Sequence, residues 1–235
     1  MRVAAIWRYP VKSMAGERLS RAEITSAGLV GDRVVQVYDR RGRIVTARTY
    51  PRLLRLHATL GSDGEPLVDG LLWNSPEVAR RVEAAVAPGA RLERFDGLER
   101  FDILPLLVCT DGSVSRFGRD VRRLRPNILI GGVDDNAERY WEGATLRLPH
   151  AEVGVADLRG RCVMTTYDPD TNEQDPGVLR DIVRRFGGRL CLNAQVVRPG
   201  IVEGGDSVSV VHERFGELDT CHDSNSPEQR PTPAG

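Results

Sequence analysis

The sequence predicts a mainly β protein of the α+β type, with a few helices at its periphery. Short apolar runs rich in strand-forming residues recur along the chain, and turns rich in Gly, Asp and Pro separate them, as in antiparallel barrels and sandwiches. Only a few segments carry the cap residues and the apolar periodicity of a helix. The predicted strands are 3–7, 18–25, 33–38, 43–47, 53–60, 104–109, 127–130, 145–148, 153–156, 162–166, 192–197 and 207–211.

Two helices are indicated by a capping residue that a proline follows. Ser75 and Asp175 are good N-caps, and proline fits the first helical position after each of them. Gly187 ends the second helix. Asp111 is a candidate cap for a short helix that runs toward Phe117.

The strand pattern breaks near residue 98, so we expect an N-terminal β-module over 1–98 and a second β domain over 99–215. A chain of 235 residues is long enough for two small domains. The polar, Pro-rich segment 216–235 is predicted to be a disordered tail.

The charge balance argues against a nucleic-acid or membrane-surface binder, because Lys+Arg and Asp+Glu are both 33 and the net charge is zero. No signal peptide is visible, and no apolar run has the ~20 residues of a membrane span. These observations predict a cytoplasmic protein, and they are compatible with a local basic pocket.

The four cysteines are widely spaced and form no C-x-x-C pair or zinc-finger pattern, so we expect reduced thiols. Cys162 differs from the others because Arg159 and Arg161 precede it. Positive charge favours the thiolate, which is both a nucleophile and a soft metal ligand. The alternative is a small buried apolar side chain, as for any free cysteine.

Three further segments carry candidate anion-binding residues. Lys12 and Ser13 follow a strand end, where an ammonium, a hydroxyl and free amides suit a phosphate; a solvated loop lysine is the alternative. Arg33 and Arg48 can each hold an anion through two hydrogen bonds, or form surface ion pairs.

The Arg125-Pro126-Asn127 segment places a guanidinium and an amide at the start of a strand, where Pro126 fixes the backbone. Both side chains can point into one site, although pairing of Arg125 with Asp134 or Glu138 is nearly as compatible with the spacing.

Asp168 and Asp170 flank a proline, which is common turn chemistry, and Asp168 is also a candidate for proton transfer. The chain has no G-x-S-x-G, Walker or G-x-G-x-x-G motif, so serine-hydrolase, NTPase and Rossmann interpretations have no support.

In their order, these motifs resemble those of the MOSC family, and within it those of the mitochondrial amidoxime-reducing component and its bacterial counterparts. Y-P-V-K-S, G-D-R, T-A-R and P-R-L are similar to the N-terminal β-barrel module that precedes MOSC. D-x-x-P-L-L, R-P-N-I, W-x-G and R-C-x-x-T-T-x-D-P-x-T are similar to MOSC itself. The resemblance spans about residues 2–211.

The resemblance implies a MOSC β-barrel, an N-terminal β-module, and a molybdenum cofactor (Mo-molybdopterin) in the cleft between them. It implies Cys162 as the metal ligand and Asp102 as a catalytic residue close to the metal, with Ile103 and Leu104 replacing small hydroxylated residues of relatives. The implied cofactor-binding residues are Lys12, Ser13, Arg33, Arg48, Arg125, Asn127 and Arg161.

The implied function is two-electron reduction of a small N-hydroxylated substrate, with N–OH converted to N–H and water released. Asp102 or Asp168 would help to deliver protons. No cysteine cluster for an iron–sulfur centre follows MOSC, so electrons are expected from a separate ferredoxin or flavoprotein reductase. The alternatives are a non-enzymatic carrier that holds sulfur or the cofactor on Cys162, and a binding module with a vestigial site.

Overall fold

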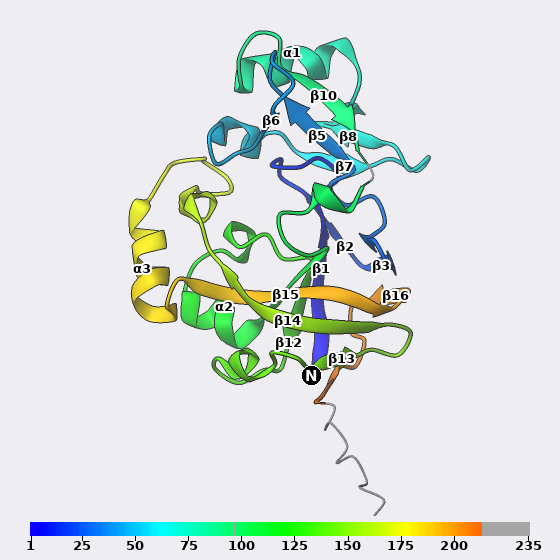
Figure 1. Ribbon diagram of the computed structural model, residues 1–235, viewed down its shortest axis with the longest axis vertical. Coiled ribbons are helices and arrows are strands. Elements are labelled where there is room, and N and C mark those ends of the chain that lie inside the picture. The colour runs from blue at the N-terminus through cyan, green and yellow to red at the C-terminus, as the bar shows by residue number, and fades with distance from the viewer. Residues whose placement is uncertain (96, 213–235) are drawn as a thin grey trace, which may run out of the picture.

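The computed structural model describes residues 1–95 and 97–212, and it confirms the mainly β, α+β architecture. Two of the three small sheets and helix α1 (Pro76–Ala85) lie at one end of the molecule, and the large sheet with helix α3 (Pro176–Phe186) and the third small sheet beside it lies toward the other (Figure 1). Over the described ranges, the strands form open sheets rather than one closed barrel.

Eight strands form the large sheet, in the order β17-β13-β14-β15-β11-β12-β1-β2. Neighbours are antiparallel except β11 and β12, which run parallel because helix α2 (Asp111–Phe117) lies in the connection between them. The strands are β1 (Arg2–Arg8), β2 (Glu17–Leu19), β11 (Leu106–Thr110), β12 (Ile128–Gly131), β13 (Thr145–Arg147), β14 (Glu152–Gly160), β15 (Arg189–Arg198) and β17 (Ser209–Val211).

Three smaller sheets have three strands each, in the orders β10-β5-β6, β16-β3-β4 and β7-β8-β9. Their strands are β3 (Arg21–Thr25), β4 (Gly28–Leu29), β5 (Val35–Tyr38), β6 (Ile44–Val45), β7 (Ala58–Leu60), β8 (Pro66–Val68), β9 (Leu71–Leu72), β10 (Arg91–Arg94) and β16 (Gly200–Glu203). The 3₁₀ helices are η1 (Pro51–Arg55), η2 (Leu98–Arg100), η3 (Val121–Arg123), η4 (Ala137–Tyr140) and η5 (Val163–Thr166).

The two proline-marked helices are confirmed, with Ser75 Oγ and an Asp175 oxygen accepting from backbone N–H groups at their starts. Gly187 ends α3 in the left-handed conformation at φ 64°. The expected cap of α2 is corrected: Thr110 is the N-cap, and its hydroxyl accepts from Ser113 N at 3.2 Å. The single strand expected over 53–60 is also wrong. Its first residues belong to η1, which begins at Pro51, and only its last residues form β7.

Alternation along the strands places two apolar clusters on opposite faces of the large sheet. Val108 belongs to the cluster that also packs β3, β4 and β16, whereas its neighbour Cys109 belongs to the cluster under α2 and α3. A third cluster, which includes Val35, lies among the strands and helices of the N-terminal part. Within the described residues, no helix is long and apolar enough to cross a membrane.

The N-terminal strand β1 belongs to the large sheet, with Ile6 paired to Ile128 of β12. The first strand is thus built into the same sheet as the second half of the chain. The boundary near residue 98 stays a prediction, and the expected tail 216–235 lies outside the described residues.

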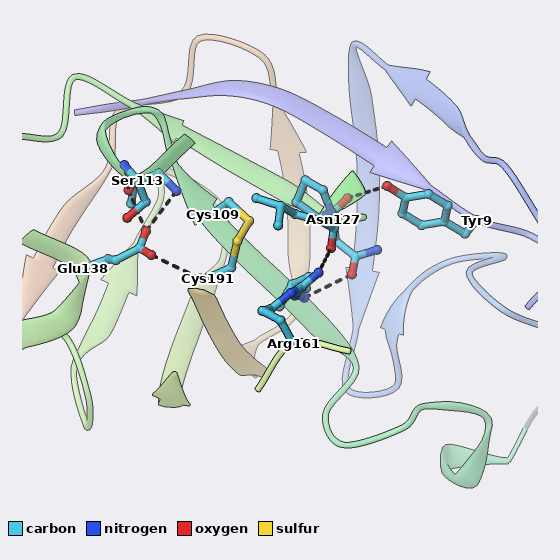
Figure 2. Close-up of a disulfide and its surroundings, with 11 residues drawn as sticks. Tyr9, Cys109, Ser113, Asn127, Glu138, Arg161 and Cys191 are labelled. Atoms are coloured by element: carbon cyan, nitrogen blue, oxygen red, sulfur yellow. Dashed lines mark hydrogen bonds between the residues drawn. A yellow bond between two sulfur atoms is a disulfide. The ribbon is translucent and has the colours of Figure 1, made fainter. Parts of the chain in front are cut away.

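The expectation of reduced thiols is wrong for two cysteines, because Cys109 and Cys191 form a disulfide (Figure 2). They lie opposite each other on antiparallel β11 and β15, as the pair Val108 and Leu192 shows. Their separation of 82 residues hides this contact in the sequence. Buried Glu138 accepts from Cys191 N at 3.2 Å.

Candidate functional site

A cavity of about 410 Å³ lies between the N-terminal part and the end of the large sheet. Segments from both halves of the chain line it. They are Lys12, Ser13, Arg33, Thr46, Arg48, Phe101, Asp102, Ile103, Leu104, Leu106, Leu107, Arg123, Leu124, Arg125, Asn127, Arg159, Gly160, Arg161, Cys162, Met164, Thr165 and Asn193. All the predicted site residues except Asp168 are among them.

The cavity lining is strongly cationic, because it carries seven basic side chains and one carboxylate, that of Asp102. The basic residues are Lys12, Arg33, Arg48, Arg123, Arg125, Arg159 and Arg161. Arg123 is not among the site residues predicted from the sequence, and Arg159 is predicted only as a neighbour of the thiol. Such a concentration of cations in a hollow attracts an anionic ligand.

Asp102 lies among three of these cations. Its carboxylate is 2.9 Å from Lys12 Nζ, 2.7 Å from Arg48 Nη2 and 3.6 Å from Arg159 Nη2. Burial raises the pKa of Asp102, but the Lys12 hydrogen bond and the neighbouring cations outweigh it and hold that pKa below its ordinary value. Asp102 is therefore a carboxylate at neutral pH.

Asp32 holds Arg33 and Asn127 in place, although it is not among the site residues predicted from the sequence. This fully buried carboxylate pairs with Arg33, accepts from Asn127 Nδ2 at 3.2 Å and accepts from Tyr9 N at 2.7 Å. The signal was present in G-D-R, because a carboxylate next to an arginine and beside a strand end can bind both.

In the part of the chain that the structure describes, the Arg125 guanidinium forms no ion pair and donates no hydrogen bond. Its guanidinium lies over the Tyr9 ring, 4.2 Å from the ring centroid, and Tyr9 in turn donates to Pro126 O at 3.1 Å. Burial lowers the pKa of Arg125 to about 10, so it stays charged at neutral pH.

Arg161 is also incompletely partnered. Its Nη2 donates to Leu124 O at 2.7 Å, while its buried Nε has no partner among the described residues. Burial lowers the pKa of Arg161 to about 10. A buried donor without an acceptor costs free energy, and a bound anion would satisfy it.

Cys162 lies in a turn rather than at the start of the strand expected over 162–166. Strand β14 ends at Gly160, and Cys162 is the N-cap of η5, with its carbonyl accepting from Thr165 N at 3.1 Å. It is half-buried and is the free cysteine of the described residues. The turn presents the thiol to the cavity instead of burying it in a sheet.

Asp168 lies outside the cavity lining, and its contacts are those of a turn. Its Oδ1 accepts from Asp170 N and Thr171 N at 3.0 Å. Its Oδ2 accepts from Arg123 Nη2 at 2.8 Å. Asp168 thus contacts Arg123 from outside the cavity lining, and its role in proton transfer stays a prediction.

Three of the cavity residues have positive φ: Ser13 at 72°, Arg33 at 56° and Arg125 at 56°. This region is unfavourable for residues other than glycine, and such strain concentrates at binding and catalytic sites. All three residues line the cavity.

The residues fit an anionic cofactor that brings its own metal donors better than a free metal ion. Within the described ranges, no group of three or more His, Cys, Asp and Glu could hold a metal. One thiol, one carboxylate, an orphaned arginine N–H and an excess of cations suit a ligand with a phosphate and further metal ligands.

Two families match most of the chain. The MOSC N-terminal beta barrel domain matches residues 1–87, and the MOSC domain matches residues 113–209. The chain therefore belongs to the MOSC proteins that carry both domains.

Among curated proteins, the chain is 28% identical to mitochondrial amidoxime reducing component 2 of Macaca fascicularis, covering 80% of this chain and 72% of that protein. It is 29% identical to mitochondrial amidoxime-reducing component 1 of Homo sapiens, covering 72% and 67%. It is 25% identical to molybdenum cofactor sulfurase of Caenorhabditis briggsae, covering 75% and 30%. The solved YUAD protein from Bacillus subtilis shares the fold, with a TM-score of 0.51, 14% identity and coverage of 91% and 96%.

Proposed function

We propose that the chain is a molybdenum-cofactor-dependent reductase of small N-hydroxylated compounds, with the Cys162 thiolate as a metal ligand. The observation that carries the proposal is that a free thiol, one carboxylate and seven cations line a single cavity. The names of the amidoxime-reducing relatives support the substrate class, and those of the sulfurase relatives support the cofactor.

Lys12, Ser13 and Arg33 would hold the cofactor phosphate, because they offer an ammonium, a hydroxyl and a guanidinium on neighbouring segments. Arg125, Asn127 and Arg161 would contact the rest of the cofactor. Arg48 would hold Asp102 and share in neutralising the bound charge.

When bound, the cofactor supplies the two-electron redox chemistry. The overall conversion is R–NH–OH plus two electrons and two protons to R–NH₂ plus water. Asp102, charged at neutral pH and hydrogen-bonded to Lys12, is placed to accept a proton on a carboxylate oxygen and pass it on.

The electron donor in this proposal is a separate protein of the ferredoxin or flavoprotein type. The proposed location is the cytoplasm. The Cys109–Cys191 disulfide makes this location worth testing, because disulfides are rare in the reducing cytosol.

The test is elemental analysis of the purified protein, followed by benzamidoxime reduction with a chemical electron donor. We expect bound molybdenum and turnover in the parent, and loss of turnover with an intact fold for Cys162→Ser. A protein without molybdenum that carries a persulfide on Cys162 would reject the reductase and support the carrier.

A further inference from the structure

A second cavity of about 690 Å³ lies beside the cationic cavity. The two share a wall, because Arg123, Arg125 and Met164 line both of them. Met164 follows Cys162 by two residues, so the second cavity adjoins the segment that carries the thiol. None of the predicted functions uses this space.

The walls of the second cavity combine aromatic and apolar surfaces. Trp7, Tyr9 and Tyr167 contribute rings, and Leu54, Val121, Pro169 and Met164 contribute apolar contacts. Aromatic walls of this kind favour a flat ring, which stacks or packs edge-on against them.

The charges around the second cavity are not balanced. The lining of the second cavity includes two carboxylates, Asp120 and Asp170, and both pair with Arg122. They therefore neutralise Arg122 rather than the other cations of the lining. Arg18 stacks on Trp7 at 5.9 Å from the ring centroid, and exposed Arg55 has no acid partner among the described residues.

We propose that the second cavity binds a flat aromatic ring that carries an acidic group, and that it holds this part of the substrate. Trp7 and Tyr167 would pack on the ring, and Arg55 and Arg18 would pair with the acid. This proposal rests on the reductase function, and it narrows the substrates to aromatic N-hydroxylated acids.

The first experiment measures binding without a reductant, so that no turnover is needed. Isothermal titration of the purified protein compares 4-carboxybenzamidoxime with benzamidoxime, which lacks the acid. We expect the acid to bind at least about tenfold more tightly, as for a charge-assisted contact. The preference should weaken as salt increases.

Arg55→Gln should remove most of the preference for the acid, and Trp7→Ala should weaken binding of both compounds. The matched control is Arg52→Gln, an exposed arginine of the same 3₁₀ helix that lines neither cavity. It should keep the parent preference. Equal binding of the two compounds by the parent, or equal behaviour of the two arginine variants, would overturn the proposal.

The second experiment separates this proposal from the proposed function. Turnover of both amidoximes with equal KM values would reject the second cavity as the substrate site and leave the reductase standing. If molybdenum-loaded protein binds the acid tightly through Arg55 but does not reduce it, the reductase function is rejected. The second cavity would still be a binding site for aromatic acids.

Discussion

Arg122 and Arg125 lie three residues apart in one basic segment, yet their surroundings are opposite. Arg122 is 45% exposed and pairs with Asp120 at 2.6 Å and Asp170 at 2.7 Å. The hydrogen bonds that Arg122 donates to Asp170 and Asp120 raise the pKa of Arg122, whereas burial lowers that of Arg125 to about 10.

The comparison shows that this protein neutralises a cation at the surface but not one in the cavity. At the surface, Arg122 is neutralised by two acids. In the cavity, half-buried Arg125 is left without an acid partner in the described part of the chain, and a charge that is partly removed from water without a partner costs free energy. We interpret this cost as the reason that the cavity favours an anionic ligand.

The largest expected effect of this difference is on cofactor loading. Arg125→Gln removes a cation that lacks an internal partner, so molybdenum content should fall by about tenfold or more, as expected for one lost charge-assisted contact. Elemental analysis of protein from molybdenum-supplemented cells measures it.

Arg122→Gln is the matched control, because it removes a cation of the same segment whose partners are both internal. Its molybdenum content should equal that of the parent. Equal loading of the Arg125→Gln and parent proteins would remove Arg125 from the cofactor site.

The sequence could predict much of the fold because strands, prolines and caps leave local signals. The helix starts at Ser75 and Asp175 follow from one cap residue and the next proline. The turn at Cys162 could not be predicted, because apolar and threonine residues after it favour a strand locally, and tertiary contacts decide for η5.

Short charged motifs and the family resemblance named ten site residues, and nine of them line one cavity. Their roles in binding the cofactor stay predictions. Which arginine of segment 119–125 faces the cavity depends on the fold, since Arg122 and Arg123 have the same local chemistry. The pairing of Asp32 with Arg33 is local and could be inferred from G-D-R. The contact of Asp32 with Asn127 and the positive φ of Arg125 depend on distant segments, which no local pattern encodes.

The cysteines extend the comparison, because Cys109 and Cys191 are fully buried and bonded while Cys162 faces the cavity. The disulfide closes a long loop and restricts the unfolded chain. The double variant Cys109→Ala/Cys191→Ala should therefore lower the free energy of unfolding by about 2–4 kcal/mol. Denaturant unfolding without reductant measures it.

Cys162→Ala serves as the control, since it should change the unfolding free energy less. Protein from cells that shows free thiols at both buried positions, and unfolding that does not respond to reductant, would restore the reduced state expected from the sequence.

Asp102 offers a smaller test, because it is the one carboxylate of the cationic cavity. Its pKa is lower in the folded protein than its ordinary value of about 3.9. Its contribution to stability is thus present above that ordinary value and is lost as the pH falls through the folded pKa.

Asp102→Asn should accordingly lose less unfolding free energy than the parent between about pH 5 and pH 2. Urea unfolding over this pH series measures the slope. Asp135→Asn changes an exposed residue outside the cavity lining, and its unfolding free energy should vary with pH as that of the parent does. An unchanged slope for Asp102→Asn would mean that Lys12 and Arg48 do not stabilise the carboxylate.

The smallest expected effect concerns stability at the two arginines in cofactor-free protein. Arg122→Gln breaks exposed ion pairs and should lower the free energy of unfolding by about 0.2–1 kcal/mol. Arg125→Gln removes a half-buried charge that has no acid partner among the described residues, so its stability should equal or exceed that of the parent. Urea unfolding of both cofactor-free variants measures whether each change lowers or raises the free energy of unfolding. If Arg125→Gln were the more destabilised variant, the Arg125 guanidinium would stabilise the fold through its contact with Tyr9. The contrast between a neutralised surface cation and an uncompensated cavity cation would then be wrong.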